Sequence, residues 1–211
     1  MVPHLHPSGL CSKNKTRVIH LNTISESKTA LRKKAKHMRS AMHKMYNMEA
    51  AEKAAKHAKS LLKDIPTQAC IGLYSSVGDE LNPCFLAHDL EQKGYRLALP
   101  VVTGKNTPLE FKRWGQGDPL SAGPYGIEEP ETNAPIVIPD VLIVPLLAYD
   151  ENCYRLGWGG GYYDRTIAKY SAIKAFGFAY AAQIVDDLPT EPHDLPLHGV
   201  ITETGVILPK K

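Results

Sequence analysis

The spacing of hydrophobic residues predicts that the N-terminal part of the chain is helical. After residue 24, apolar side chains recur at intervals of three or four, at Leu31, Ala35, Met38, Met42 and Met45. Ser25 and Ser27 are residue types that cap helix N-termini, so a helix is expected to begin there. A second helix, rich in alanine and lysine, is expected over residues 49–63.

Beyond residue 68 the pattern changes to short apolar runs separated by turn residues. We expect strands over residues 69–74, 96–102, 109–114, 141–148 and 175–180, and one or two more within 199–208. Helices are expected over residues 83–93 and 163–170, the first ended by Gly94. The stretch 115–135 is crowded with glycine and proline and predicts an ordered loop over a site.

This alternation predicts a single Rossmann-like α/β domain in three layers, with a mostly parallel sheet covered by helices on both faces. Ligands of such sheets bind beyond the carboxyl ends of the strands. The segments that lie there are residues 75–80, 150–163 and 181–194. The domain is expected to span residues 25–211. Residues 1–24 contain no acid, as in a transit peptide, but they lack an Arg-rich amphipathic pattern and an apolar segment, so we expect a disordered tail.

Composition is consistent with one soluble domain. The chain has 211 residues, of which 43% are hydrophobic and 22% are charged. The longest apolar run, residues 141–149, contains Pro145 and is too short to cross a bilayer. The four cysteines have no paired spacing, which favours free thiols in a reducing compartment. We therefore expect a cytoplasmic protein, monomeric and without a membrane partner.

Charge is distributed unevenly along the chain. Residues 1–63 hold 14 lysines and arginines against three acids, whereas the remaining residues hold 11 against 19. A basic segment of this kind fits an anionic small molecule, nucleic acid or a solvated helix face. Surfaces that stack on bases carry interleaved aromatic residues, and the basic helices contain only Tyr46. Nucleic acid is therefore not expected as a partner.

A cluster of four glycines, at 157, 159, 160 and 161, precedes the expected helix at 163–170. Glycine permits positive φ, which lets several N–H groups converge on one anion, and the helix N-terminus adds its positive dipole end. Arg155 and Arg165 flank the loop and can bind phosphate oxygens. The spacing is neither that of a Walker A loop nor that of a dinucleotide fingerprint, so a tight structural turn remains the alternative.

Asp164 directly follows this cluster. A carboxylate beside a phosphate-binding loop is unfavourable unless a cation bridges the two, which makes Asp164 a candidate Mg²⁺ ligand. The alternative is that its charge complements the dipole of the following helix.

The string Arg155-Leu-Gly-Trp-Gly-Gly-Gly-Tyr-Tyr-Asp164 resembles the signature of the 5-formyltetrahydrofolate cyclo-ligase family. The resemblance continues over nearly the whole chain after residue 24. It includes the pair Lys28 and Arg32, the segments 74–80 and 126–130, Gln183, the pair His193 and Asp194, and the segment 200–203.

The resemblance implies conversion of 5-formyltetrahydrofolate, with or without a polyglutamate tail, to 5,10-methenyltetrahydrofolate with ATP and Mg²⁺. The formyl oxygen would attack the γ-phosphate to give an iminium phosphate, N10 would close the ring, and ADP and phosphate would be released. Phosphoryl transfer depends mainly on positioning and charge neutralisation, so it requires no protein nucleophile.

Site residues follow from the resemblance position by position. ATP contacts are implied for Lys28, Arg32, Arg155, Leu156, Gly157, Trp158, Gly159, Gly160, Gly161, Tyr162 and Tyr163. Folate contacts are implied for Ser75, Glu80, Tyr125, Trp158, Gly159, Gly160, Gly161 and Tyr162, with Glu80 on the guanidine-like edge of the pterin. Arg155 and Tyr163 are the implied catalytic residues, and Asp164 and Asp194 the implied Mg²⁺ ligands.

An alternative on the same α/β plan is a phosphate-ligand protein of the sugar-phosphate isomerase or CoA-transferase type, without cyclo-ligase activity. Such a protein would use the glycine loop for a phosphate. It would not need Lys28, Arg32, Asp164 and Asp194 together.

Overall fold

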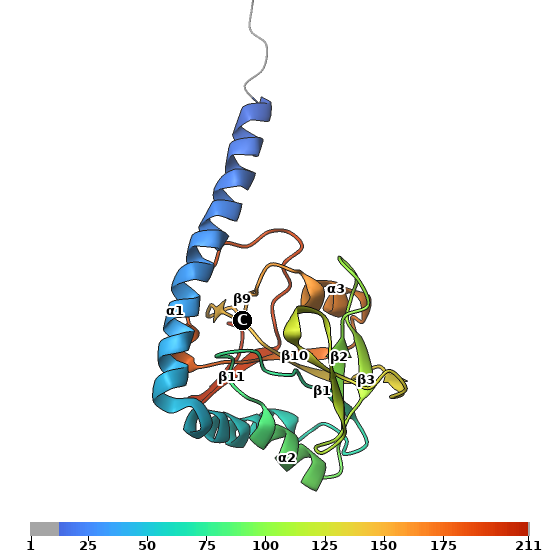
Figure 1. Cartoon of the computed structure of the whole chain (residues 1–211). Coiled ribbons are helices and arrows are strands. Elements are labelled where there is room, and N and C mark those ends of the chain that lie inside the picture. Colours follow the sequence, from blue (N-terminus) through green and yellow to red (C-terminus); the bar gives the residue numbers. More distant parts are fainter. Residues whose placement is uncertain (1–12, 211) are drawn as a thin grey trace, which may run out of the picture.

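The computed structural model describes residues 13–210, and their side chains from residue 24 onward. Helix α1 (Lys13–Leu62) bends at Asn47, whose φ of 11° and ψ of −97° are not helical. The two expected helices are therefore present on either side of the bend, and Figure 1 shows them running in different directions. The first begins at Lys13, earlier than expected, because residues 13–24 contain no proline or glycine to stop it. Residues 1–12 of the predicted tail lie outside the described residues.

The central sheet is mostly parallel, as predicted. Its strands are β1 (Cys70–Gly72), β2 (Arg96–Val101), β3 (Glu110–Arg113), β6 (Ile136–Val137), β7 (Val141–Val144), β10 (Lys174–Phe178), β11 (Gly199–Thr202) and β12 (Gly205–Ile207). Their order is β12-β11-β10-β7-β1-β2-β3-β6. The five strands from β11 to β2 run parallel, whereas β12, β3 and β6 pair antiparallel at the two edges.

Two short hairpins lie outside this sheet. One pairs β4 (Leu120–Ala122) with β5 (Glu128–Pro130) across the turn η1 (Pro124–Gly126), within the stretch expected to be a loop. The other pairs β8 (Ala148–Tyr149) with β9 (Arg155–Leu156). The apolar run expected as one strand over residues 141–148 is therefore divided, because Pro145 has no N–H to continue the ladder of β7.

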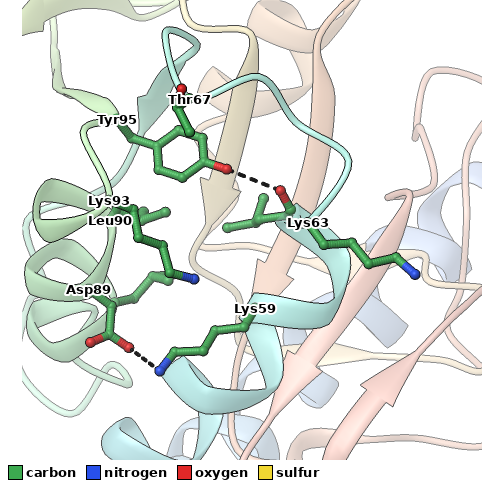
Figure 2. Close-up of a pocket in the computed structure, with 9 residues that line it drawn as sticks. Lys59, Lys63, Thr67, Asp89, Leu90, Lys93 and Tyr95 are labelled. Atoms are coloured by element: carbon green, nitrogen blue, oxygen red, sulfur yellow. Dashed lines mark hydrogen bonds and ion pairs between the residues drawn. The ribbon is translucent and has the colours of Figure 1, made fainter.

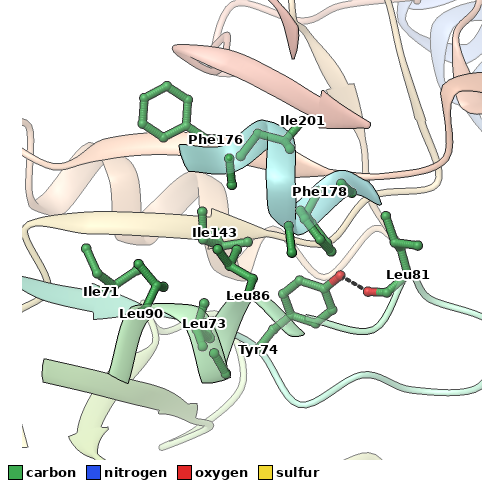
Figure 3. Packing of buried hydrophobic residues seen from close by; sticks show 14 of the residues in the cluster. Ile71, Leu73, Tyr74, Leu81, Leu86, Leu90, Ile143, Phe176, Phe178 and Ile201 are labelled. Atoms are coloured by element: carbon green, nitrogen blue, oxygen red, sulfur yellow. Dashed lines mark hydrogen bonds between the residues drawn. The ribbon is translucent and has the colours of Figure 1, made fainter. Parts of the chain in front are cut away.

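One face of the sheet is covered by the second half of α1 and by α2 (Cys84–Gln92). The alanines of α1 at this face are all at most 1% exposed, namely Ala50, Ala51, Ala54, Ala55 and Ala58. Figure 3 shows the larger side chains of this cluster, which come from the strands, from the segment after β1 and from α2. Small side chains on the helix let it approach the sheet closely, while leucine, isoleucine and phenylalanine fill the space.

The opposite face is covered by α3 (Tyr162–Lys169), through Ile167. The residues of β7 are buried on both faces, which explains why this strand reads as a continuous apolar run. A third cluster joins Ala35, in the first half of α1, to Leu147, Leu156 and Leu188. This contact holds the first half of α1 beside the carboxyl ends of the parallel strands. No helix within residues 13–210 is long and apolar enough to span a membrane.

Candidate functional site

The predicted site loops meet at the carboxyl edge of the sheet. Trp158 Nε1 donates a hydrogen bond to Glu80 Oε1 at 3.1 Å, which joins the loop after β1 to the glycine loop. Arg155 Nη1 donates to the Leu195 carbonyl at 3.1 Å, which joins the glycine loop to the segment after β10. Parallel strands place their carboxyl ends along one edge, and this topology brings the loops together as expected.

The two predicted bases of α1 point at these loops. The Lys28 ammonium lies 2.6 Å from Asp194 Oδ2 and 2.7 Å from Glu191 Oε2. Arg32 Nε donates to the Gly157 carbonyl at 3.0 Å. A spacing of four residues places both side chains on one helical face, and the structure brings that face to the glycine loop and the 181–194 segment.

The glycine loop follows the β8–β9 hairpin and leads into α3. Gly159 and Gly161 have φ values of 103° and 65°, a region that favours glycine. Gly157 has open space for a Cβ, whereas a Cβ at Gly160 would lie 3.0 Å from the Tyr162 ring. The side chain of Leu156 is buried in the apolar cluster that it shares with Ala35. Among the implied ATP contacts, Leu156 can therefore offer only its backbone.

Arg165 is engaged by the loop itself. Its Nη2 donates to the Gly160 carbonyl at 2.6 Å, its Nε donates to the Thr107 carbonyl at 3.1 Å, and its Cζ lies 5.2 Å from the centre of the Tyr162 ring. We expected a flanking base that could bind phosphate oxygens. In this structure Arg165 fixes the conformation of the loop.

Arg155 contacts one implied metal ligand directly and the backbone beside the other. Its Nη2 contacts Asp164 Oδ1 at 2.5 Å, and its Nη1 contacts the carbonyl of Leu195, the residue that follows Asp194. Asp164 stands in the first turn of α3, so its charge also complements the helix dipole. Both aspartates are therefore paired with a base, Asp164 with Arg155 and Asp194 with Lys28.

The carboxylates at this edge fit one kind of metal site. Within residues 13–210, no three histidine, cysteine, aspartate or glutamate side chains are grouped so that they could hold a metal ion. Mg²⁺ is commonly bound through one or two carboxylates, with water and substrate phosphates completing its shell. Asp164 and Asp194 supply the ligand type that Mg²⁺ takes, but two carboxylates do not make a site that encloses a metal by protein alone.

Glu80 is buried, at 6% exposure, and its carboxylate is held on several sides. Its Oε2 accepts the Val77 N–H at 3.1 Å, and its Oε1 also lies 3.4 Å from Arg39 Nη1. Arg39 is a site residue that our sequence reasoning missed. The available signal was its position two helical turns after Arg32, on the face that carries Lys28.

Tyr163 remains a neutral phenol at physiological pH. Burial raises its pKa, the nearby Glu80 charge raises it further, and only Arg155 opposes them. Burial and Glu80 also raise the pKa of Tyr74, whose hydroxyl donates to the Leu81 carbonyl. A neutral phenol can donate a hydrogen bond to an anionic ligand.

Tyr125 and Tyr162 form an aromatic pair beside the loop. Their hydroxyls lie 3.2 Å apart, and their ring centres 6.5 Å apart in an edge-to-face arrangement. Tyr125 is 67% exposed at the turn of the β4–β5 hairpin. The structure thus places the hairpin beside the glycine loop.

Ser75 lines a cavity of about 330 Å³ beside the 75–80 loop. Tyr74, Asn82 and Trp114 also line it. Trp114 Nε1 is the one buried side-chain polar atom among the described residues that lacks a hydrogen-bond partner. The cavity therefore adjoins Ser75, one of the implied folate contacts.

A second cavity of about 330 Å³ lies between the second half of α1 and α2, and Figure 2 shows its lining. Lys59 pairs there with Asp89 at 3.0 Å, and the Tyr95 hydroxyl donates to the Leu62 carbonyl at 3.2 Å. None of the predicted site residues lines this cavity. We therefore place the functional site at the carboxyl edge of the sheet.

The fold and the site define an α/β enzyme in which a base-flanked glycine loop, carboxylates and a long N-terminal helix meet at one edge of a parallel sheet. The model of the 5-formyltetrahydrofolate cyclo-ligase family matches residues 24–203. The chain belongs to this family.

Similar proteins agree with this assignment. The 5-formyltetrahydrofolate cyclo-ligase of Haemophilus influenzae is 31% identical over 185 residues, which cover 84% of this chain and 98% of that protein. That of Escherichia coli K12 is 36% identical over 143 residues, or 64% of this chain and 79% of the relative. Among solved structures, Aquifex aeolicus 5,10-methenyltetrahydrofolate synthetase has a TM-score of 0.69 at 29% identity, covering 87% of this chain and 93% of that one.

Proposed function

We propose that the protein converts 5-formyltetrahydrofolate to 5,10-methenyltetrahydrofolate in a reaction that consumes ATP and requires Mg²⁺. The observation that carries the proposal is the meeting of Lys28, Arg32 and Arg155 with Asp164 and Asp194 around one glycine loop. A phosphate-ligand protein of the isomerase or transferase type would not need this whole set. The similar proteins described above are named for the conversion of 5-formyltetrahydrofolate or the synthesis of 5,10-methenyltetrahydrofolate.

The nucleotide is proposed to bind where the first half of α1 faces the glycine loop. Lys28 and Arg32 would contact its phosphates, together with the backbone of residues 157–161 and the start of α3. Asp164 and Asp194 would hold Mg²⁺, which neutralises phosphate charge when bound. The carboxylates that now pair with Lys28 and Arg155 would then share these bases with the nucleotide.

The folate is proposed to bind on the other side of the loop. Glu80 would accept a hydrogen bond from the guanidine-like edge of the pterin through Oε2, which accepts only the Val77 N–H and retains acceptor capacity. Its Oε1 already faces Trp158 Nε1 and Arg39 Nη1. The aromatic rings available to the folate near the loop are those of Trp158, Tyr162 and Tyr125. The cavity beside Ser75 would accommodate part of the ligand.

The chemistry requires the formyl oxygen to approach the γ-phosphate in line. Arg155 is held rigidly by Asp164 and the Leu195 carbonyl, so it can stabilise charge that develops on the transferred phosphoryl group. Tyr163, as a neutral phenol, would donate to an oxygen of either ligand. The phosphorylated formyl group, an iminium phosphate, would then be attacked by N10, with loss of phosphate and closure of the ring.

The decisive experiment adds 5-formyltetrahydrofolate to the purified protein and follows the absorbance of the methenyl product. Product is expected only when ATP and Mg²⁺ are both present, with one ADP formed per methenyl group. A folded protein that forms no product under these conditions would contradict the proposal. We further propose that the enzyme is a cytoplasmic monomer, which sedimentation and fractionation of the source cells can test.

A further inference from the structure

A buried arginine connects α1 to the proposed folate-binding residues. Arg39 is 1% exposed, although its guanidinium carries a full charge. Its Nε and Nη2 both contact Asp79 Oδ1, at 2.8 Å and 2.6 Å, and Nη1 lies 3.5 Å from the Leu146 carbonyl. A buried charge is tolerated only when it is paired and hydrogen-bonded, and Asp79 supplies the closest pairing here.

The remaining contact of Arg39 is with Glu80, and it is longer. Arg39 Nη1 lies 3.4 Å from Glu80 Oε1, against 2.6 Å for the contact with Asp79. Because Asp79 takes the short contacts, Arg39 neutralises Glu80 only in part. Glu80 thus keeps negative charge for a ligand, while the guanidinium limits the positions that its carboxylate can adopt.

Trp158 depends on the same two residues. Its Nε1 donates to the Glu80 oxygen that faces Arg39, and its ring lies 5.2 Å from Arg39 Cζ. The Lys36 ammonium lies over the ring as well, 4.2 Å from its centre. Trp158 is nevertheless 52% exposed, so part of the ring stays open to a ligand. Cations over an indole favour a fixed ring position.

We infer that Arg39 is a positioning residue for the folate, which orients Glu80 and Trp158 without touching the reacting atoms. The inference rests on the proposed function, because it assigns Glu80 and Trp158 to the folate. It separates Arg39 from Lys28 and Arg32, which occupy the same helical face but contact the 181–194 segment and the glycine loop. Loss of Arg39 is therefore expected to affect folate binding and to leave nucleotide binding intact.

The test compares Arg39→Met and Arg39→Lys with Arg113→Met, which removes an exposed arginine from β3. Binding of 5-formyltetrahydrofolate is measured by calorimetry without ATP, and KM is measured for each substrate. We expect Arg39→Met to weaken folate binding about tenfold or more, since hydrogen bonds to charged groups are involved. The KM for ATP is expected to stay within about twofold of the wild-type value, and Arg113→Met to resemble the wild type.

Arg39→Lys keeps the buried charge but cannot reach Asp79 and Glu80 in the same fork, so it is expected to lie between the wild type and Arg39→Met. It also serves as the test if Arg39→Met does not fold. Unchanged folate affinity in a folded Arg39 variant, or equal losses for folate and ATP, would overturn the inference. Failure of the proposed function is recognised separately, because the wild type itself would then neither bind the folate nor form product.

Discussion

The ammonium of Lys28 lies 2.6 Å from Asp194 Oδ2, a contact between residues 166 positions apart in the chain. Asp194 Oδ2 also accepts the Glu191 N–H at 2.7 Å, so the carboxylate is fixed before any ligand arrives. A base and an implied metal ligand are thus held together in the free protein. Binding of Mg²⁺ and a nucleotide would replace part of this pairing with contacts to phosphate.

Removing either partner is expected to impair nucleotide use. For Lys28→Met we predict a KM for ATP raised about tenfold or more, because a charged hydrogen-bond donor to phosphate is lost. Asp194→Asn should lower kcat at subsaturating Mg²⁺ and recover in part as Mg²⁺ is increased. Lys34→Met, an exposed position on the same helix, is the matched control. Unaltered kinetics in both variants would mean that the contact between Lys28 and Asp194 only holds α1 against the 181–194 segment.

The pairing of Lys28 also predicts a pH dependence of stability. Burial alone would lower the pKa of Lys28, but hydrogen bonds and charges from Asp194 and Glu191 outweigh it and raise the pKa. A raised pKa means that the folded state binds the proton more tightly. The stabilisation is therefore fully present below the unfolded pKa of about 10.4, and it is lost as pH rises through the folded value.

Urea denaturation of the wild type and Lys28→Met at several pH values checks this expectation. The difference between their free energies of unfolding should be constant from about pH 7 to pH 9 and should shrink above about pH 10.4. A difference that persists unchanged into the alkaline range would show that the ion pair does not stabilise the fold.

The contact between Arg155 and Asp164 is expected to serve catalysis. We predict that Arg155→Ala lowers kcat about 100-fold or more, as loss of a charge-stabilising group at a reaction centre commonly does. Asp164→Asn should abolish most turnover through loss of a Mg²⁺ ligand. Circular dichroism should be unchanged, because Asp164 is partly exposed and does not support the core. Near-normal activity of both variants would indicate that the loop is only structural.

Two glycines of the loop provide a matched pair of substitutions. Gly161 has a φ of 65°, so Gly161→Ala should lower the free energy of unfolding by about 1 kcal/mol. At Gly157 no heavy atom lies within 4 Å of an added Cβ, and the backbone does not require glycine. Gly157→Ala should therefore leave thermal stability unchanged. Equal losses of stability in the two variants would show that the positive φ at position 161 is not the reason why glycine is needed there.

Metal removal should separate catalysis from stability. EDTA is expected to abolish turnover, and excess Mg²⁺ to restore it, because the ion would bind with the nucleotide through only two carboxylates. The melting temperature without nucleotide should not change on adding EDTA, since the described residues hold no three-ligand metal group. A fall of several degrees would instead indicate a resident structural metal.

Much of the fold could be predicted because the central strands are buried on both faces. Such strands read as continuous apolar runs, as Val141–Val144 does, and they alternate with helices whose ends are marked by glycine and proline. The hairpins β4–β5 and β8–β9 were not predicted. Their strands are two or three residues long, which is too short for a period to be recognised.

The site was predicted at the level of loops, and less well at the level of single contacts. Parallel topology alone brings the loops after β1, β7 and β10 to one edge. Most of the expected site residues came from the family resemblance of the segment 155–164. Arg39 was missed because helical spacing places it on the face of Lys28 and Arg32 but does not show which residues it will meet there. Only the position of the 75–80 loop, set by the tertiary fold, makes Arg39 the partner of Asp79 and Glu80.

The first half of α1 carries Lys28, Arg32 and Arg39 on one face, at separations of four and seven residues. An α-helix turns by about 100° per residue, so these separations return each side chain to nearly the same angle. A single residue inserted between positions 32 and 39 would rotate Lys28 and Arg32 by about 100° away from their loops, while the alanine-rich half beyond Asn47 kept its place in the core. Helical phase therefore restricts length variation in this part of the chain, so deletions and insertions here should be far more damaging than most single substitutions.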